Sequence, residues 1–142
     1  MARYAFTYPA MTESEEQMLD DLGRVLGSAP ISKDRQRGFV LAVCEAFTNA
    51  LLHGNGSNPD KLIRVGLEVN EMGVSADITD EGKGGLEKIM HRRDRGLLAE
   101  GGRGIDLIHH FADAVDFTET EKGGLTVTIF VSLKGKANIH VQ

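Results

Sequence analysis

Three side chains capable of polar chemistry lie at four-residue steps in the segment CEAFTNALLHGNG, residues 44–56, and they are Glu45, Asn49 and His53. Helical residues four apart differ by only about 40° around the axis, so Glu45 and Asn49 share one side of a helix. A carboxylate close to an apolar stripe needs a partner, because burying it alone is costly. The spacing therefore indicates either a functional polar site or the solvated edge of an amphipathic helix.

A further carboxylate, Asp80, stands at the end of an expected strand. The apolar residues of that strand occupy even-numbered positions, namely Met72, Val74, Ala76 and Ile78. Asp80 continues this phase, so it points to the core side of the sheet. Gly82 and Gly84 follow in the run DEGKGG, and they permit a sharp turn and the close approach of a ligand. Such a carboxylate suits a flat donor group such as an exocyclic amine, although a plain Asp-Gly turn leaving a strand is also common.

The pattern EGGRGIDLI, residues 100–108, is a glycine-rich segment that leads directly into a helix. A helix start presents unpaired backbone N–H groups and the positive end of the helix dipole, so it can bind an anion, and Arg103 adds a positive charge. An ordinary helix start is the alternative. The segment is not a P-loop, because no G-x-x-x-x-G-K-[ST] occurs, and it does not follow the first strand of a βαβ unit as a Rossmann fingerprint would.

The elements that must position these residues follow from hydrophobic periodicity and capping signals. Thr12 with Glu15 forms a capping-box pattern, Ser32 is a candidate helix cap, and Gly54 is a candidate C′ residue. The expected elements are a strand at 3–9, helices starting at 12, running from 32 to 54 and starting near 103, a hairpin of strands at 63–69 and 72–78, weak helical periodicity at 87–95, and strands near 114–118 and 125–133. This order predicts an α+β fold, a two-layer sandwich in which helices cover one face of a mostly antiparallel mixed sheet.

The composition favours a single domain covering residues 1–142. The hydrophobic fraction is 41% and the charged fraction is 26%, both ordinary for a globular protein. The net charge of −5 argues against direct nucleic-acid binding. No apolar run approaches the roughly 18 residues of a membrane span, and the N-terminus has no secretory signal. The single cysteine excludes an internal disulfide. The expectation is therefore a cytoplasmic protein without direct nucleic-acid or membrane contact.

In this order, the segments EAFTNALLHGN, DEGKG, GGRGIDLI and GGLTVTIF resemble the Bergerat-type ATPase family, which includes gyrase and the histidine kinases. They are most similar to the small bacterial anti-sigma factors that are also serine kinases, and the resemblance covers nearly the whole chain. It implies an ATP site between the sheet and the helices, under a mobile lid at about residues 85–102. It also implies ATP and Mg²⁺ as cofactors.

The resemblance implies roles for individual residues. Glu45 would be the general base that polarises the attacking hydroxyl or water, and Asn49 would coordinate Mg²⁺ through its amide oxygen, since a hard cation prefers oxygen ligands. Asp80 would accept a hydrogen bond from the adenine amino group. The other implied nucleotide contacts are Gly82 and Gly84 beside the purine, Gly102, Arg103 and Gly104 at the phosphates, and Thr126 beside the adenine, directly or through water.

The orientation of Thr126 is left open by the sequence. The neighbouring apolar residues alternate as a core face, and they are Leu125, Val127, Ile129 and Val131. This alternation would turn Thr126 away from the core, whereas the family role needs it on the side of Asp80. Either the face that bears Thr126 packs on the helices, or a bulge intervenes, and a buried outer face would fit a dimer.

Three further features lie close to the expected site. Gly85 stands where the family often has an aromatic residue, so the lid can begin differently. His53 lies one turn beyond Asn49, and a structural role is favoured for it. The basic run at 91–95 falls in the expected lid, where it would contact phosphates or a partner, unless it is only a solvated face.

The resemblance implies an ATP-binding anti-sigma factor and serine/threonine protein kinase that phosphorylates a small antagonist protein in a partner-switching system. The expected partners are a sigma factor, the antagonist and a second copy of the chain, because apolar alternation on both outer strands also suggests a homodimer. The alternative is a nucleotide-regulated binding module that sequesters a partner without significant kinase activity, and the intact Glu45 favours the kinase. A stand-alone catalytic domain acting on histidine is disfavoured, because no helix with a phospho-acceptor histidine precedes the domain.

Overall fold

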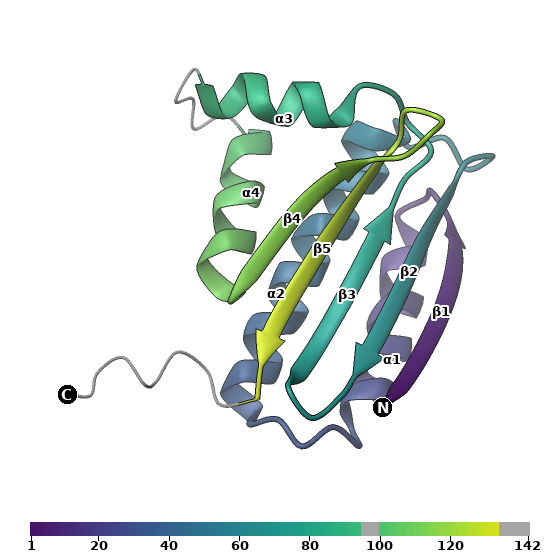
Figure 1. The fold of residues 1–142 in the computed structure, drawn as a ribbon. Helices are drawn as coiled ribbons and strands as arrows, with labels where there is room; N and C mark the ends of the chain where they lie inside the picture. Colours follow the sequence, from purple (N-terminus) through teal and green to yellow (C-terminus); the bar gives the residue numbers. More distant parts are fainter. Residues whose placement is uncertain (95–99, 134–142) are drawn as a thin grey trace.

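The computed structural model describes residues 1–94 and 100–133, and the side chains of residues 1–90 and 105–133. Its elements in chain order are β1 (Ala2–Pro9), α1 (Glu13–Leu26), α2 (Lys33–Asn49), the π-helical segment η1 (Ala50–Gly54), β2 (Leu62–Val69), β3 (Gly73–Thr79), α3 (Gly85–Asp94), α4 (Glu100–Phe111), β4 (Ala114–Glu119) and β5 (Leu125–Ser132) (Figure 1). The expected strands and helices are therefore present with small shifts at their ends, and the weakly periodic segment at 87–95 lies mostly within a helix.

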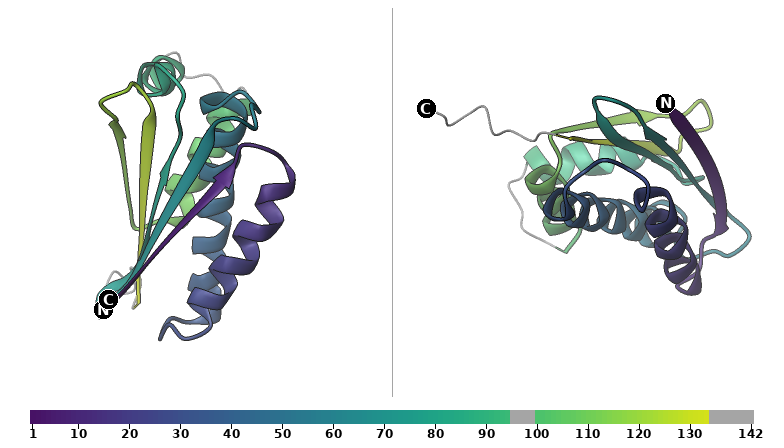
Figure 2. Two further views of the ribbon diagram at one scale, coloured as in Figure 1. Left: turned by 90° about the vertical axis from the view of Figure 1, so that its right-hand side faces the viewer. Right: turned by 90° about the horizontal axis from the view of Figure 1, so that it is seen from below.

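The five strands form one sheet in the order β1-β2-β3-β5-β4, and every described strand pair is antiparallel. Helices α1, α2 and α4 cover one face of the sheet, and α3 runs across one end of it (Figure 2). The predicted two-layer α+β sandwich is confirmed, and its sheet is antiparallel rather than mixed.

A single hydrophobic core lies between the sheet and the helices. The strand residues that face the helices are buried, and in β2, β3 and β5 they are Ile63, Val65, Leu67, Val74, Ala76, Ile78, Leu125, Val127, Ile129 and Val131. The alternation used above to suggest a homodimer therefore belongs to this core. Among the described residues, the opposite face of the sheet carries mainly polar and small side chains, and it includes Phe130 of β5.

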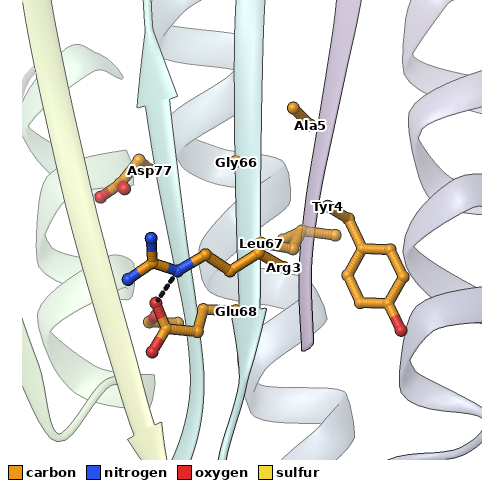
Figure 3. A pocket seen from close by; sticks show the side chains of 8 residues that line it. Arg3, Tyr4, Ala5, Gly66, Leu67, Glu68 and Asp77 are labelled. Atoms are coloured by element: carbon orange, nitrogen blue, oxygen red, sulfur yellow. Dashed lines mark hydrogen bonds and ion pairs between the residues drawn. The ribbon is translucent and has the colours of Figure 1, made fainter. Parts of the chain in front are cut away.

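The outer face of the sheet contains a shallow hollow of about 450 Å³ over β1, β2 and β3 (Figure 3). Gly66 lies at its centre, and an ion pair of 3.1 Å between Arg3 Nε and Glu68 Oε1 spans it. Asp77 lies at its edge. Because the hollow opens away from the helices, it is separate from the side of the sheet to which Asp80 points.

The two predicted helix caps have different outcomes. Ser32 caps α2 as predicted, because its hydroxyl accepts a hydrogen bond of 3.3 Å from the Arg35 backbone N–H. The capping-box prediction for Thr12 is wrong, since the Thr12 side chain makes no cap hydrogen bond. Thr12 already has helical backbone angles, φ −58° and ψ −36°, whereas a capping side chain requires an extended residue. The carboxylate of Glu15 instead lies 3.5 Å from the Thr48 hydroxyl, on α2.

The helix that carries Glu45 and Asn49 continues to Gly54, but its last turn is a π-helix. The Asn55 N–H donates to the Ala50 carbonyl at 2.8 Å, a step of five residues instead of four. Gly54 does not serve as a left-handed C′ residue, because the positive φ angles occur later, at Gly56 and Ser57. Glycine is required at position 54 because this residue packs against the Asp80 side chain.

Candidate functional site

Asp80 lies directly after β3 on the helix side of the sheet, as the strand phase predicts, and only 4% of its surface is exposed. Its Oδ1 atom accepts two backbone hydrogen bonds, from Gly82 N at 2.9 Å and from Leu125 N at 3.1 Å. The Asp80 N–H donates to the Leu125 carbonyl at 3.0 Å. One carboxylate oxygen is therefore held by backbone on both sides, which orients the other oxygen.

The second oxygen of Asp80, Oδ2, faces the end of the α2–η1 helix. A Cβ atom placed on Gly54 would overlap Oδ2, and a Cβ atom on Gly82 would overlap the Gly54 carbonyl. Both glycines are thus needed for the helix end and the loop after β3 to meet. Among the described residues, none donates a hydrogen bond to Oδ2, so this buried oxygen keeps an acceptor without a donor.

Glu45 and Asn49 lie one turn apart near the C-terminal end of α2, and both side chains are half-buried. Neither makes a side-chain hydrogen bond with any residue whose side chain the structure describes. The i→i+5 bonding of η1 places Gly54 one π turn beyond Asn49. The same helix therefore carries the carboxylate and the amide and then packs its end against Asp80.

Cys44, beside Glu45, behaves as a core thiol. Burial raises its pKa to about 11, and the nearby carboxylates of Glu15 and Glu45 add to the rise. The thiol therefore remains protonated at neutral pH. His53 lies exposed on η1.

Thr126 lies on the outer face of the sheet, opposite to the face that Asp80 takes. Its hydroxyl oxygen is 2.8 Å from the Thr79 hydroxyl oxygen, and the two residues are partners in an uninterrupted β3–β5 register. No bulge reverses the alternation, so the structure does not bring the Thr126 side chain to Asp80. The neighbouring residue Leu125 reaches Asp80 instead, through its backbone N–H.

The predicted phosphate-binding residues Gly102, Arg103 and Gly104 lie in the first turns of α4, which begins at Glu100. The side chain of Arg103 lies outside the described part of the chain, so the phosphate-binding role of the three residues stays a prediction. The predicted lid contains α3 and the start of α4, and residues 95–99 within it lie outside the described residues, as do the side chains of the basic run at 91–95.

Gly84 and Gly85 stand at the start of the predicted lid, and a different structural feature favours glycine at each position. Gly84 has φ +69°, a left-handed conformation that favours glycine. A Cβ atom at Gly85 would lie 3.2 Å from the Leu125 Cβ atom, so a large side chain in this conformation would press on Leu125. The departure from the family's aromatic residue is consistent with this close packing.

Asn55 is a buried polar residue beside Asp80 that the sequence reasoning missed. It is only 2% exposed, and its side chain donates to the Leu62 carbonyl at 3.0 Å and accepts from the Glu81 N–H at 2.7 Å. Its position in a Gly-Asn-Gly run indicates only a turn. Its burial depends on the hydrogen bond with Glu81, the residue after Asp80, and a single sequence does not show that these two segments meet.

The residues present fit an adenine nucleotide and a magnesium ion. Asp80 Oδ2 is a buried acceptor without a donor among the described residues, which suits the adenine amino group. Asn49 supplies an amide oxygen, a ligand type that Mg²⁺ accepts. Within the described part of the chain, no group of three His, Cys, Asp or Glu residues could hold a metal ion. A metal at this site would therefore be held by Asn49 together with phosphate and water oxygens.

Comparisons with known proteins show which chains this one is similar to. The chain is 34% identical over 102 residues to an anti-sigma F factor of Clostridium beijerinckii, covering 69% of this chain and 68% of that protein. It is 29% identical over 104 residues to an anti-sigma F factor of Pasteuria penetrans, covering 70% of this chain and 69% of that protein.

A crystal structure of the RsbU and RsbW domains of a Mycobacterium tuberculosis protein has a similar fold, with a TM-score of 0.67 over 92% of this chain at 17% identity. The chain spans about a third of that protein, 32%, and the likeness concerns the fold alone. A family model described as the histidine kinase-like ATPase domain matches residues 8–131. The chain therefore belongs to the histidine kinase-like ATPase domain family.

Proposed function

We propose that this protein is an ATP-dependent anti-sigma factor that phosphorylates a small antagonist protein on serine or threonine, as part of a partner-switching system. The observation that carries the proposal is the junction between α2–η1 and the loop after β3. There, a helix bearing Glu45 and Asn49 ends against a buried carboxylate, one oxygen of which accepts from no described residue. The similarity to anti-sigma F factors supports the choice of partners.

The proposed division of roles follows from position. Asp80 accepts a hydrogen bond from the adenine amino group at the sheet end of the site, and this bond orients the base. Asn49, one π turn before Gly54, would hold Mg²⁺ through its amide oxygen, and the ion would supply charge neutralisation for phosphoryl transfer. The backbone N–H groups at the start of α4 and Arg103 provide the remaining contacts to phosphate oxygens.

Glu45 is the proposed general base. It lies one turn before Asn49 on the same side of α2, so it stands farther from the adenine end of the site than the metal ligand. In this role its carboxylate takes the proton of the serine or threonine hydroxyl as that oxygen bonds to the γ-phosphorus and ADP leaves. Positioned bases contribute typically 10²–10⁴-fold to such a step.

The test is transfer of radiolabelled γ-phosphate from ATP to a candidate antagonist protein, measured beside nucleotide affinity. The Glu45→Ala variant is expected to bind ATP with nearly wild-type affinity and to transfer phosphate about 10²–10⁴-fold more slowly. A wild-type rate in this variant would exclude Glu45 as the base. Tight ATP binding by the wild type without transfer to any antagonist would favour a nucleotide-regulated binding module in place of the kinase.

A further inference from the structure

Asn55 closes a ring of three hydrogen bonds beside the proposed nucleotide site. Asn55 Nδ2 donates to the Leu62 carbonyl at 3.0 Å, the Leu62 N–H donates to Glu81 Oε1 at 2.9 Å, and the Glu81 N–H donates to Asn55 Oδ1 at 2.7 Å. The ring joins the end of η1, the start of β2 and the loop after β3. These three segments come together nowhere else through side-chain hydrogen bonds among the described residues.

We infer that Asn55 is a positioning residue that sets Asp80 for adenine recognition, an inference that rests on the proposed nucleotide site. Glu81 is the residue directly after Asp80, so holding its N–H holds the loop on which Asp80 turns toward the helix. Asn55 directly follows Gly54, the residue that packs against Asp80 Oδ2. One buried side chain thus ties together the two segments whose contact forms the adenine end of the site.

The burial of Asn55 distinguishes it from an ordinary turn residue. Only 2% of its surface is exposed, and its side-chain oxygen and nitrogen are both used. A side-chain amide holds an NH₂ donor group and a carbonyl acceptor in one fixed plane, which matches the Leu62 carbonyl and the Glu81 N–H. An apolar side chain would leave the Leu62 carbonyl and the Glu81 N–H without the partners that Asn55 provides. The loop after β3 would then no longer be held in place against the end of the helix.

The closing experiment compares ATP with GTP affinity, because this ratio reports how Asp80 is placed and a general loss of stability does not change it. In Asn55→Ala, the ratio of ATP to GTP affinity is expected to fall about tenfold. Asn55→Asp keeps an acceptor for the Glu81 N–H but places a carboxylate oxygen against the Leu62 carbonyl, so its affinity ratio is also expected to fall. A folded Asn55→Ala variant with the wild-type ratio would overturn the inference.

Asn70→Ala is the matched control. Asn70 also accepts backbone hydrogen bonds in a turn, from Met72 N at 2.8 Å and Gly73 N at 3.2 Å, but it follows the far end of β2. The eight residues of β2 separate the two turns by roughly 26 Å. Asn70→Ala is expected to lower thermal stability and to leave the affinity ratio unchanged, and a tenfold change in its ratio would count against a local effect of Asn55.

A double-mutant cycle tests whether Asn55 acts through Asp80. In an Asp80→Asn background, Asn55→Ala should produce no further loss of the affinity ratio, and an additive loss would contradict the inference. If Asn55→Ala does not fold, Asn55→Ser, whose side chain is too short to keep both hydrogen bonds, takes its place with the same expected fall, and a wild-type ratio in this variant would overturn the inference. A wild type without preference for ATP would overturn the adenine role of Asp80 and this inference together.

Discussion

Replacing Asp80 by asparagine tests adenine recognition directly, because the structure dictates how the new side chain sits. Asp80 Oδ1 accepts N–H groups from Gly82 and Leu125. An asparagine has only one side-chain oxygen, and turning its NH₂ group toward these two donors would leave both without an acceptor. The asparagine oxygen is therefore expected to take the place of Oδ1, and the NH₂ group the place of Oδ2.

The size of the effect follows from this orientation. The adenine amino group would then meet a donor where it needs an acceptor, and a buried polar group without its partner costs about 1–3 kcal/mol. This free energy corresponds to roughly 5- to 150-fold weaker ATP binding. Guanine presents a carbonyl oxygen where adenine has its amino group, so GTP affinity should be kept or increased.

Calorimetry with ATP and GTP in the presence of Mg²⁺ measures both affinities, and a thermal melt confirms that each variant is folded. Asp77→Asn is the matched control, since Asp77 lies on the same strand but on the outer face of the sheet. There, its carboxylate accepts a hydrogen bond of 2.7 Å from the Thr128 hydroxyl. It should leave both affinities unchanged. Equal affinity of the wild type for ATP and GTP, or an undiminished ATP preference in folded Asp80→Asn, would refute the reasoning.

Three further outcomes are expected. Asn49→Ala should weaken nucleotide binding in the presence of Mg²⁺ and have little effect in its absence, as titrations with and without EDTA would show; equal losses in both would exclude a metal ligand. Gly54→Ala should destabilise the fold by about 1–3 kcal/mol in urea unfolding, because the new Cβ overlaps Asp80 Oδ2. Its control, Gly23→Ala on α1, meets nothing within 4 Å and should gain about 0.5–1 kcal/mol, so a neutral Gly54→Ala would show that the helix end and the loop separate easily. Light scattering at micromolar concentration should report roughly twice 15.4 kDa, as the family resemblance leads us to expect, and a strict monomer that still binds its partner would contradict the homodimer.

The periodic spacing of side chains in a helix and in a strand accounts for what the sequence alone could predict. Helical spacing placed Glu45 and Asn49 on one side of α2, and the two-residue period of the strand placed Asp80 on the core side. The Ser32 cap is equally local, because it depends on residues three apart. Each of these features needs only the backbone geometry of a single element, which a run of residues largely determines.

Contacts between segments distant in the chain decided the rest. The failed Thr12 cap shows that a local signal alone is insufficient, since Thr12 joined the helix instead of capping it. The continuous pairing of Thr126 with Thr79 decided which face Thr126 takes. The requirement for glycine at position 54 and the burial of Asn55 both arise from packing against the loop at 80–82, which is about 26 residues away. Such contacts depend on how elements pack, and no spacing within one element encodes them.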